Sequence, residues 1–338
     1  MSGDLSLINT MTDPIWIFIT SFFGAFGPMA AYTSLVWWMD RYEREPLRLL
    51  VFLFLCGAIP CAGIALIAHF TLSFLATRSL PLLINEPVSV VVLAPLIEET
   101  IKFLPILLIR NHNDFNNPTD GIVYGSAVGF GFAMTENLFY FLDSFYTWGP
   151  FNWLWTMIIR TVFTGMLHAF STGFAGYMLG RAKYHHARHR TSMAAGLAVA
   201  ILFHMSWNST MFLAASLELS RYLYFFFGCF PALIVVMILL MQFSLFEESV
   251  IIREELAAEA ATGLITAKQF GIIPYYHKRV AKHWISPGIK REFLNCATKL
   301  AFKKRELKYM NAMELDLARC EIEELRNRLR ALARESGT

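Results

Sequence analysis

APLIEETIKFLP, the segment from Ala94 to Pro105, places Glu98, Glu99 and Lys102 inside an apolar run that is long enough to cross a membrane. A spanning helix needs about 20 mostly apolar residues. An ionisable group at bilayer depth costs at least about 2.5–3.5 kcal/mol, so such groups usually face the interior of a helix bundle and serve a function. The segment therefore predicts a membrane helix bundle with a polar site inside it.

The composition of the whole chain also indicates a membrane protein. Of the 338 residues, 56% are hydrophobic and 16% are charged, whereas a soluble domain is usually about 45–50% apolar and about 25% charged. The cysteines are scattered and form neither a disulfide framework nor a CxxC zinc pattern. We expect the lipid bilayer as a partner of this chain, and no nucleic acid.

Seven apolar segments are long enough to span the membrane, and none has the strict alternation of a β-barrel strand. They cover residues 15–38, 48–76, 86–109, 121–143, 151–180, 193–216 and 222–246. Because lipid offers no hydrogen bonds to the backbone, each segment is expected to be a helix. The predicted fold class is an all-α polytopic membrane bundle of about seven spans, followed by a cytoplasmic helical tail.

Lys and Arg in the short loops indicate the orientation of the bundle. The loops after the first, third and fifth segments carry most of them: Arg41, Arg44, Arg48, Arg110, Arg181, Lys183, Arg188 and Arg190. On the other side only Arg78 and Arg221 occur. Since basic loops stay in the cytoplasm, we expect an external N-terminus and a cytoplasmic C-terminus.

The chain changes character at residue 247, where charged residues become frequent. We predict a transmembrane domain over residues 1–246 and a basic, amphipathic tail over residues 247–338. The basic and aromatic stretch from Tyr275 to Phe293 lies either against the anionic inner leaflet or in a solvated linker.

A heptad-like pattern ends the tail. Apolar residues recur there at alternating spacings of three and four: Leu315, Ala318, Ile322, Leu325, Leu329 and Leu332. This pattern predicts a helix that forms a short coiled coil or docks on the membrane domain. Self-association through this helix is therefore an expected partner interaction.

Further polar groups interrupt the other apolar segments. TENLFYF contains Glu136 and Asn137, the fifth segment contains His168, and the sixth contains His204 with Asn208 one helical turn later. Small residues nearby would let the helices approach closely: Gly129, Gly131, Gly165, Gly173 and Gly176. We expect the polar side chains to converge, whereas His69 and Glu86, near segment ends, are expected at the membrane interface.

These residue types suit hydrolysis by an activated water. Carboxylates, imidazoles and a carboxamide can supply a general base, a proton shuttle and an oxyanion donor, or ligands for a divalent ion such as zinc. No serine or cysteine has an evident partner that would make it a nucleophile. Either Glu98 or Glu99 can pair with Lys102, because both spacings place the side chains within reach on a helix. The predicted catalytic residues are Glu98, Glu99, Glu136, His168, His204 and Asn208, and the predicted supporting residues are Lys102 and Asn137.

The motifs resemble those of the PrsW family of intramembrane proteases, within the larger group that contains the CAAX prenyl endopeptidases. The matching motifs are EETIK at Glu98–Lys102, FAMTEN at Phe132–Asn137, His168 in LHAF, and HMSWN at His204–Asn208. Their order and their placement in successive segments agree over residues 15–246. The resemblance implies an intramembrane endopeptidase of the bacterial inner or plasma membrane.

The resemblance also implies roles for these residues. Carried over from the CAAX endopeptidases, Glu98 is the base, Glu136 is its partner, and His204 with Asn208 stabilises the oxyanion. Glu136 stands where those enzymes have histidine, so two alternatives stay open. One is a metal-free glutamate protease. The other is a site for Zn²⁺ or another divalent ion, with the ligands Glu98, Glu136, His168 and His204. PrsW proteases are associated with site-1 cleavage of membrane-anchored anti-sigma factors, which implies a membrane-anchored protein substrate.

Two functions of other classes are alternatives to proteolysis. A secondary transporter also places Glu, His and Lys at the membrane midplane, but transporters usually show internal repeats, and we find no duplication in this sequence. A non-catalytic membrane scaffold acting through the C-terminal tail would leave the acids within the apolar segments unexplained.

Overall fold

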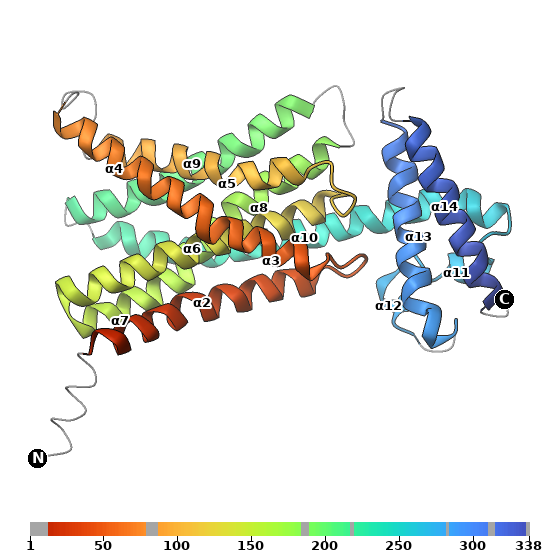
Figure 1. Cartoon of the computed structure of the whole chain (residues 1–338), viewed down its shortest axis with the longest axis horizontal. Coiled ribbons are helices and arrows are strands. Elements are labelled where there is room, and N and C mark those ends of the chain that lie inside the picture. Colours follow the sequence, from red (N-terminus) through yellow and green to blue (C-terminus); the bar gives the residue numbers. More distant parts are fainter. Residues whose placement is uncertain are drawn as a thin grey trace, which may run out of the picture.

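The computed structural model describes residues 13–78, 87–183, 189–216, 220–281, 284–309 and 315–335, where every regular element is a helix. Figure 1 shows a bundle of long helices lying side by side, with a group of shorter helices at one end. The prediction of an all-α fold is therefore confirmed for the described part of the chain.

All seven predicted segments are helical over their described residues. Glu86, at the start of the third segment, lies outside the described ranges. The elements of the bundle are α2 (Pro14–Met39), α3 (Leu47–Cys56), η1 (Gly57–Cys61), α4 (Ala62–Arg78), η2 (Val88–Leu93), α5 (Ala94–Ile109), α6 (Pro118–Trp148), α7 (Pro150–Ile159), η3 (Arg160–Thr164), α8 (Gly165–Ala182), α9 (His189–Ser216) and α10 (Ser220–Ala261). Here η denotes a π-helical stretch.

Within the described part of the chain, four helical stretches are long and apolar enough to cross a membrane. They are Pro14–Met39, Leu47–Leu75, Arg190–Ala214 and Pro231–Ala261. The segments outside this set are rich in glycine or charge, and α6 and α8 are buried along much of their length. Helices that face other helices rather than lipid can carry polar residues, which explains their lower hydrophobicity.

Glycines allow α6 and α8 to touch backbone to backbone. A Cβ atom added at Gly121, Gly125 or Gly129 would lie 2.1 to 2.4 Å from a backbone oxygen of α8. These residues are four apart and share one face of α6, which is the small-residue spacing of close helix pairs. Other glycines singled out from the sequence also lie at helix contacts: Gly131, Gly165, Gly173 and Gly176.

The three π-helical stretches interrupt the regular backbone hydrogen bonding beside the bundle interior. In η1, the carbonyl of Ala58 accepts from Thr135 Oγ1 at 2.6 Å, and in η2 the carbonyl of Val90 accepts from Asn208 Nδ2 at 2.9 Å. Short π-helical insertions occur frequently at functional sites. Here the two hydrogen bonds join α6 to η1 and α9 to η2.

The C-terminal helices surround the end of α10. They are α11 (Ala267–Phe270), α12 (Tyr276–Arg279), α13 (Pro287–Leu307) and α14 (Leu315–Glu335). Ile252 and Leu256 of α10 form a separate hydrophobic cluster with Phe293 and Leu300 of α13 and Leu329 of α14. Because α10 runs without a break across residues 246 and 247, the division into two domains at that point stays a prediction.

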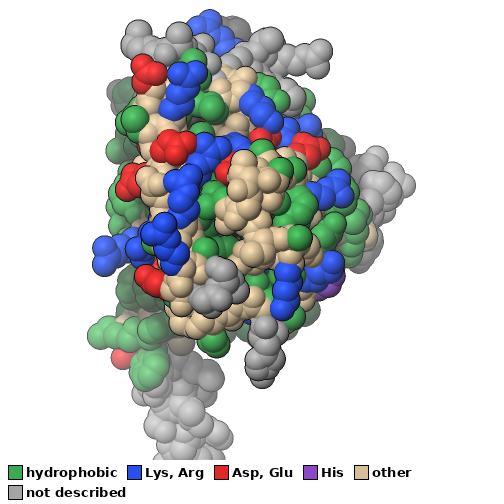
Figure 2. All heavy atoms as spheres, turned by 90° about the vertical axis from the view of Figure 1, so that its right-hand side faces the viewer, with side chains coloured by type: hydrophobic (Ala, Val, Ile, Leu, Met, Phe, Trp, Pro, Cys, Tyr) green, Lys and Arg blue, Asp and Glu red, His purple; other side chains and the backbone are tan. Residues whose placement is uncertain are grey.

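The apolar residues of the heptad pattern of α14 pack against other helices of the same chain. Ala318, Ile322, Leu329 and Leu332 are buried, and α14 packs on α13. Self-association through α14 therefore stays a prediction. Figure 2 shows the end of the molecule formed by these helices, with Lys and Arg side chains spread over it and Asp and Glu between them.

The basic and aromatic stretch from Tyr275 to Phe293 is partly internal. Arg279 and Trp284 are buried. The stretch therefore contributes to the core of the C-terminal helices. It is neither a wholly exposed linker nor a wholly exposed membrane-binding surface.

Three loops that the sequence predicts to be cytoplasmic lie together at the end of the bundle that carries the C-terminal helices. Lys299 of α13 contacts Glu43 in the loop after α2 at 3.4 Å and Asp114 in the loop after α5 at 3.1 Å. Lys183, after α8, lies 3.7 Å from Glu306 of α13. The loops that share a predicted side are thus also neighbours in space.

Candidate active site

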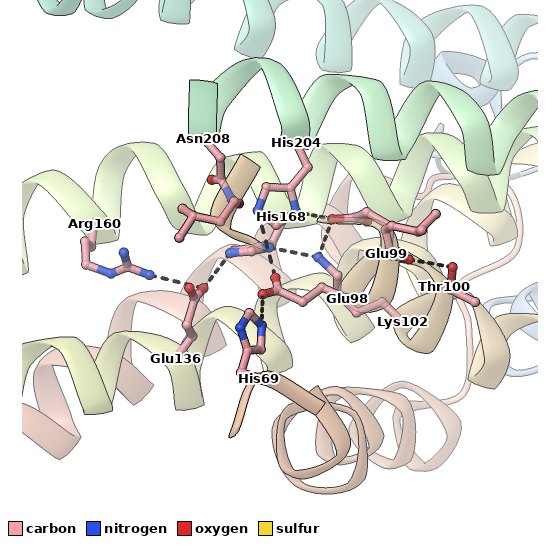
Figure 3. Close-up of polar contacts among 12 residues, drawn as sticks. His69, Glu98, Glu99, Thr100, Lys102, Glu136, Arg160, His168, His204 and Asn208 are labelled. Carbon is pink, nitrogen blue, oxygen red and sulfur yellow. Dashed lines mark hydrogen bonds and ion pairs between the residues drawn. The ribbon is translucent and has the colours of Figure 1, made fainter. Parts of the chain in front are cut away.

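Glu98, His168 and His204 come from α5, α8 and α9 and meet inside the bundle (Figure 3). All three are buried, and one oxygen or nitrogen atom from each lies within 4.8 Å of the others. The close contact of α6 with α8 contributes to this arrangement, since Gly129 lies against the backbone of His168. Residues far apart in the sequence therefore form one polar cluster.

Glu99 lies between two nitrogen donors. Lys102 Nζ donates to Glu99 Oε1 at 2.5 Å, and His204 Nδ1 lies 2.8 Å from the same oxygen. A carboxylate can only accept, so Nδ1 of His204 carries a hydrogen, and in the neutral imidazole its Nε2 carries a lone pair. Of the two acids that could pair with Lys102, Glu99 is the one that does so in the structure.

Glu98 has a different environment from its neighbour. Its Oε1 contacts His69 Nε2 at 2.9 Å, and its Oε2 is buried without a hydrogen-bond partner among the described residues. That Oε2 lies 3.9 Å from His204 Nε2. A buried oxygen without a partner requires an explanation, and a bound ion or water is one. His69, expected at the membrane interface, instead contacts the cluster.

His168 bridges Lys102 and Glu136. Its Nδ1 lies 2.9 Å from Lys102 Nζ, and its Nε2 lies 2.7 Å from Glu136 Oε2. Because an ammonium group only donates, Nδ1 accepts from Lys102, and Nε2 then donates to Glu136. His168 thus joins the buried acid–base pair of α5 to the glutamate of α6.

Arg160 is part of the site, although the sequence analysis missed it. Its Nη2 lies 3.1 Å from Glu136 Oε2, and its Nε donates to Asn137 Oδ1 at 3.0 Å. The guanidinium also lies 3.6 Å from the centre of the Tyr140 ring. The signal was present in the sequence, because Arg160 is a charged residue inside the apolar segment 151–180.

Asn208 is the one predicted catalytic residue that the structure does not bring into contact with the cluster. Its Nδ2 donates to the carbonyl of Val90 in η2. It lies one helical turn beyond His204 on α9 and therefore near the site, as Figure 3 shows. Its amide connects α9 to the helix that leads into α5.

The cluster reaches the surface on one side. The side chains of His69 and Glu136 are 38% and 24% exposed, whereas those of Lys102 and His168 are fully buried. A substrate would therefore approach from the side of His69 and Glu136.

The residue types of the three-residue cluster suit a divalent metal, although both nitrogens of His168 contact other residues in this structure. Two imidazoles and one carboxylate form a ligand set found at catalytic zinc sites. Glu99 holds His204 by Nδ1, as carboxylates do for metal-binding histidines, and Glu98 Oε2 is an unused oxygen facing His204 Nε2. Glu136, the fourth predicted ligand, lies outside this group and contacts His168 instead.

Comparison with known proteins gives a consistent result. The profile of the family described as PrsW family intramembrane metalloprotease matches residues 45–241. The protein named Protease PrsW from Geobacillus kaustophilus is 30% identical over 180 residues, which are 53% of this chain and 73% of that protein. Protease PrsW from Oceanobacillus iheyensis is 28% identical over 183 residues, 54% of this chain and 78% of that protein.

A further relative is Protease PrsW from Bacillus subtilis, which is 25% identical over 195 residues, 54% of this chain and 78% of that protein. No solved structure matches the chain. Every residue of the cluster falls within the region matched by the family profile, and the helices from α11 onward lie beyond it.

Proposed function

Because the chain belongs to the PrsW family of intramembrane metalloproteases, we propose that its Glu/His cluster hydrolyses a peptide bond of a membrane-anchored protein, within or next to the membrane. The observation that carries this proposal is the buried Glu98 Oε2, which has no hydrogen-bond partner among the described residues and lies 3.9 Å from His204 Nε2. The family assignment favours neither a transporter nor a scaffold.

Glu98, His168 and His204 would hold a divalent metal such as zinc. When bound, such an ion would polarise the scissile carbonyl and acidify the attacking water. Glu99 fixes the orientation of His204, and Lys102 balances the charge of Glu99. His168 would contribute a nitrogen only after giving up its contact with Lys102 or with Glu136.

Glu136 is our candidate for the group that takes the proton from the attacking water. Its side chain is more exposed than those of Glu98 and Glu99. His168 and Arg160 both contact its Oε2, so Oε1 is available to accept a proton. Arg160 and Asn137 keep this carboxylate in place. In the metal-free alternative, Glu98 would be the base and Glu136 its partner.

The amide nitrogen of Asn208 has two hydrogens and gives one to the carbonyl of Val90, so the other could serve an oxyanion; we assign Asn208 first to positioning α9 against η2. His204 is the better placed of the pair to act on the reacting atoms, because it belongs to the cluster.

We further infer a seven-span bundle in a bacterial inner membrane, with the C-terminal helices in the cytoplasm. Its support is the shared position of the basic loops and the C-terminal helices at one end of the bundle, together with the positive-inside rule. The substrate we infer is a membrane-anchored regulator that is cut at a first site.

Cleavage by the purified chain in proteoliposomes tests the proposal. The substrates are single-span reporter proteins with differing membrane and flanking sequences. We expect wild type to cut at least one reporter, Glu98→Gln to cut none, and Asp143→Asn to act like wild type, because Asp143 is an exposed acid on α6 outside the cluster. Wild-type rates in Glu98→Gln would remove this cluster from the mechanism, and a folded wild type that cuts no reporter would contradict the proposed activity.

A further inference from the structure

A second group of acidic residues is buried at the end of the bundle, beside the C-terminal helices. Asp40, Glu43 and Glu45 lie in the loop between α2 and α3, Asp120 lies in the first turn of α6, and Glu248 lies in α10. Each of these five residues is at most 8% exposed. None of them belongs to the hydrolytic cluster.

Three of these residues form a compact set of oxygen atoms. One carboxylate oxygen from each of Asp40, Glu45 and Asp120 lies within 4.8 Å of the others. Asp40 is 1% exposed and its Oδ2 has no hydrogen-bond partner among the described residues, and the same holds for Oδ1 of Asp120. The set therefore contains buried oxygens that nothing in the described structure satisfies.

Two other oxygens of these residues accept hydrogen bonds from the protein. Asp120 Oδ2 accepts from the backbone N–H groups of Asn116 at 2.5 Å and Asn117 at 3.1 Å. Glu45 Oε2 accepts from the hydroxyl of Tyr124. These bonds fix the carboxylates in place and leave an unused oxygen on Asp120.

The nearby cations Lys183, Lys299 and Arg279 have their close contacts with other groups. Among the described residues, the ion pairs of this region reach Glu43, from Lys299 Nζ at 3.4 Å, but not Asp40, Glu45 or Asp120. Arg279 lies close by, yet its donors go to the carbonyls of Tyr42 and Ile273 and to Thr298 Oγ1. Buried carboxylates without a partner are costly unless they share protons or bind a metal.

We propose that Asp40, Glu45 and Asp120 bind a hard divalent cation, Mg²⁺ or Ca²⁺. Carboxylate oxygens are the ligands that these ions prefer, whereas the imidazoles of the hydrolytic cluster suit zinc. Asp120 and Glu136 are both on α6, about 24 Å apart at 1.5 Å per residue. The cation site is therefore separate from the hydrolytic cluster and does not depend on its chemistry.

The bound cation would stabilise the docking of the C-terminal helices on the bundle. It would join the loop after α2 to the start of α6. The same loop contacts the C-terminal helices, because the Tyr42 hydroxyl donates to the carbonyl of Pro274 at 3.0 Å and the Tyr42 carbonyl accepts from Arg279 at 3.1 Å. Removing the cation should weaken the contact between the bundle and the C-terminal helices before it affects the rest of the fold.

Terbium luminescence tests the site in the full-length chain after treatment with a chelator. Tb³⁺ replaces Ca²⁺ at oxygen sites and emits when an excited aromatic ring is close. Trp37 Nε1 donates to the Glu45 carbonyl at 2.8 Å and the Tyr124 hydroxyl donates to the Glu45 carboxylate, so both can sensitise it. We expect saturable emission that Ca²⁺ or Mg²⁺ displaces, and the ion effective at the lower concentration is the preferred ligand.

Variants separate this site from other acidic groups. Asp40→Asn and Glu45→Gln should weaken Tb³⁺ binding at least about tenfold, the loss of one charged ligand. Glu254→Gln, at an exposed acid on α10, and His204→Ala, in the hydrolytic cluster, should leave it unchanged. Trp37→Phe should lower the emission but not the affinity.

Two results would overturn the proposal. One is Tb³⁺ emission that Asp40→Asn and Glu45→Gln leave unaltered. The other, which needs no variant, is a folded wild type whose thermal unfolding temperature rises no more with Ca²⁺ or Mg²⁺ than with K⁺ at equal ionic strength. In that second case the carboxylates share protons instead of binding a cation.

Discussion

Glu98 and Glu99 are adjacent in the sequence but have different partners. Glu99 is enclosed by Lys102 and His204, whereas Glu98 contacts the partly exposed His69 and keeps one oxygen unused. We therefore propose a place at the reacting atoms for the first glutamate and a positioning role for the second. The two roles predict different consequences for substitution.

Glu99→Gln should destabilise the fold as well as stop cleavage. Lys102 is fully buried and would lose its charge partner, and removing one member of a buried ion pair costs about 3–5 kcal/mol. Chemical unfolding in detergent should show this loss for Glu99→Gln and a much smaller one for Glu98→Gln. The double variant Glu99→Gln, Lys102→Met should regain stability without activity. A Glu99→Gln protein as stable as wild type would refute the positioning role.

Arg160→Lys should slow cleavage while the protein stays folded. Lysine keeps the charge but cannot contact Glu136 and Asn137 together as the planar guanidinium does. Loss of a group that positions a catalytic residue typically costs about 10–100-fold in activity. Arg110→Lys, outside the site, is the matched control. Equal cleavage rates for the two variants would show that Arg160 has no positioning role.

At the residue scale, sequence patterns find polar groups but not their partners. Glu98, Glu136, His168 and His204 each interrupt an apolar segment, and Arg160 does so by the same criterion. Glu98 and Glu99 lie four and three residues before Lys102, and both spacings allow pairing with it on a helix. Glu99 is the partner because of where α9 places His204. His69 lies near the end of its segment, and its contact with Glu98 depends on how α4 crosses α5.

At the scale of the helices, apolar length predicts where each segment runs but not its internal irregularities. The predicted span 48–76 is a helix whose regular hydrogen bonding changes at Gly57–Cys61. Proline at residue 60 cannot donate a hydrogen bond there, and the carbonyl of Ala58 accepts from Thr135 on another helix. Such stretches depend on contacts between helices, which periodicity along one segment does not contain.

Gly129→Ala should disturb the contact between α6 and α8. The added Cβ would lie 2.4 Å from the carbonyl oxygen of His168, and overpacking of this kind typically costs about 1–3 kcal/mol. Gly63→Ala is the matched control, because nothing lies within 4 Å of a Cβ added there. Thermal unfolding should separate the two variants. If Gly129→Ala unfolds at the temperature of Gly63→Ala, the helices do not approach as closely as described.

At the scale of the whole molecule, we expect a defined topology. A reporter fused after Thr338 should behave as cytoplasmic, and one inserted in the turn at residues 148–152 as external, because that turn lies at the end of the bundle opposite to the C-terminal helices (Figure 1). Paired phosphatase and fluorescent-protein fusions would measure both positions. An external C-terminus would contradict the orientation and the span count.

The place of the C-terminal helices is the part of the molecule that the sequence predicts least well. The heptad spacing of α14 identifies a buried face but not its partner, which is α13 of the same chain. The contacts of Lys299 with Glu43 and of Arg279 with Tyr42 join residues more than 200 positions apart. Neither contact leaves a local pattern in the sequence.

The metal content of the purified chain tests whether Glu98, His168 and His204 form a metal-dependent hydrolytic centre. Elemental analysis should find about one zinc or other transition metal ion per chain in wild type. Asn208→Ala should keep that ion, because its amide contacts Val90 and not the cluster, and His204→Ala should lose it. Full transition-metal content in His204→Ala, or cleavage by a wild-type protein free of such metals, would contradict the account.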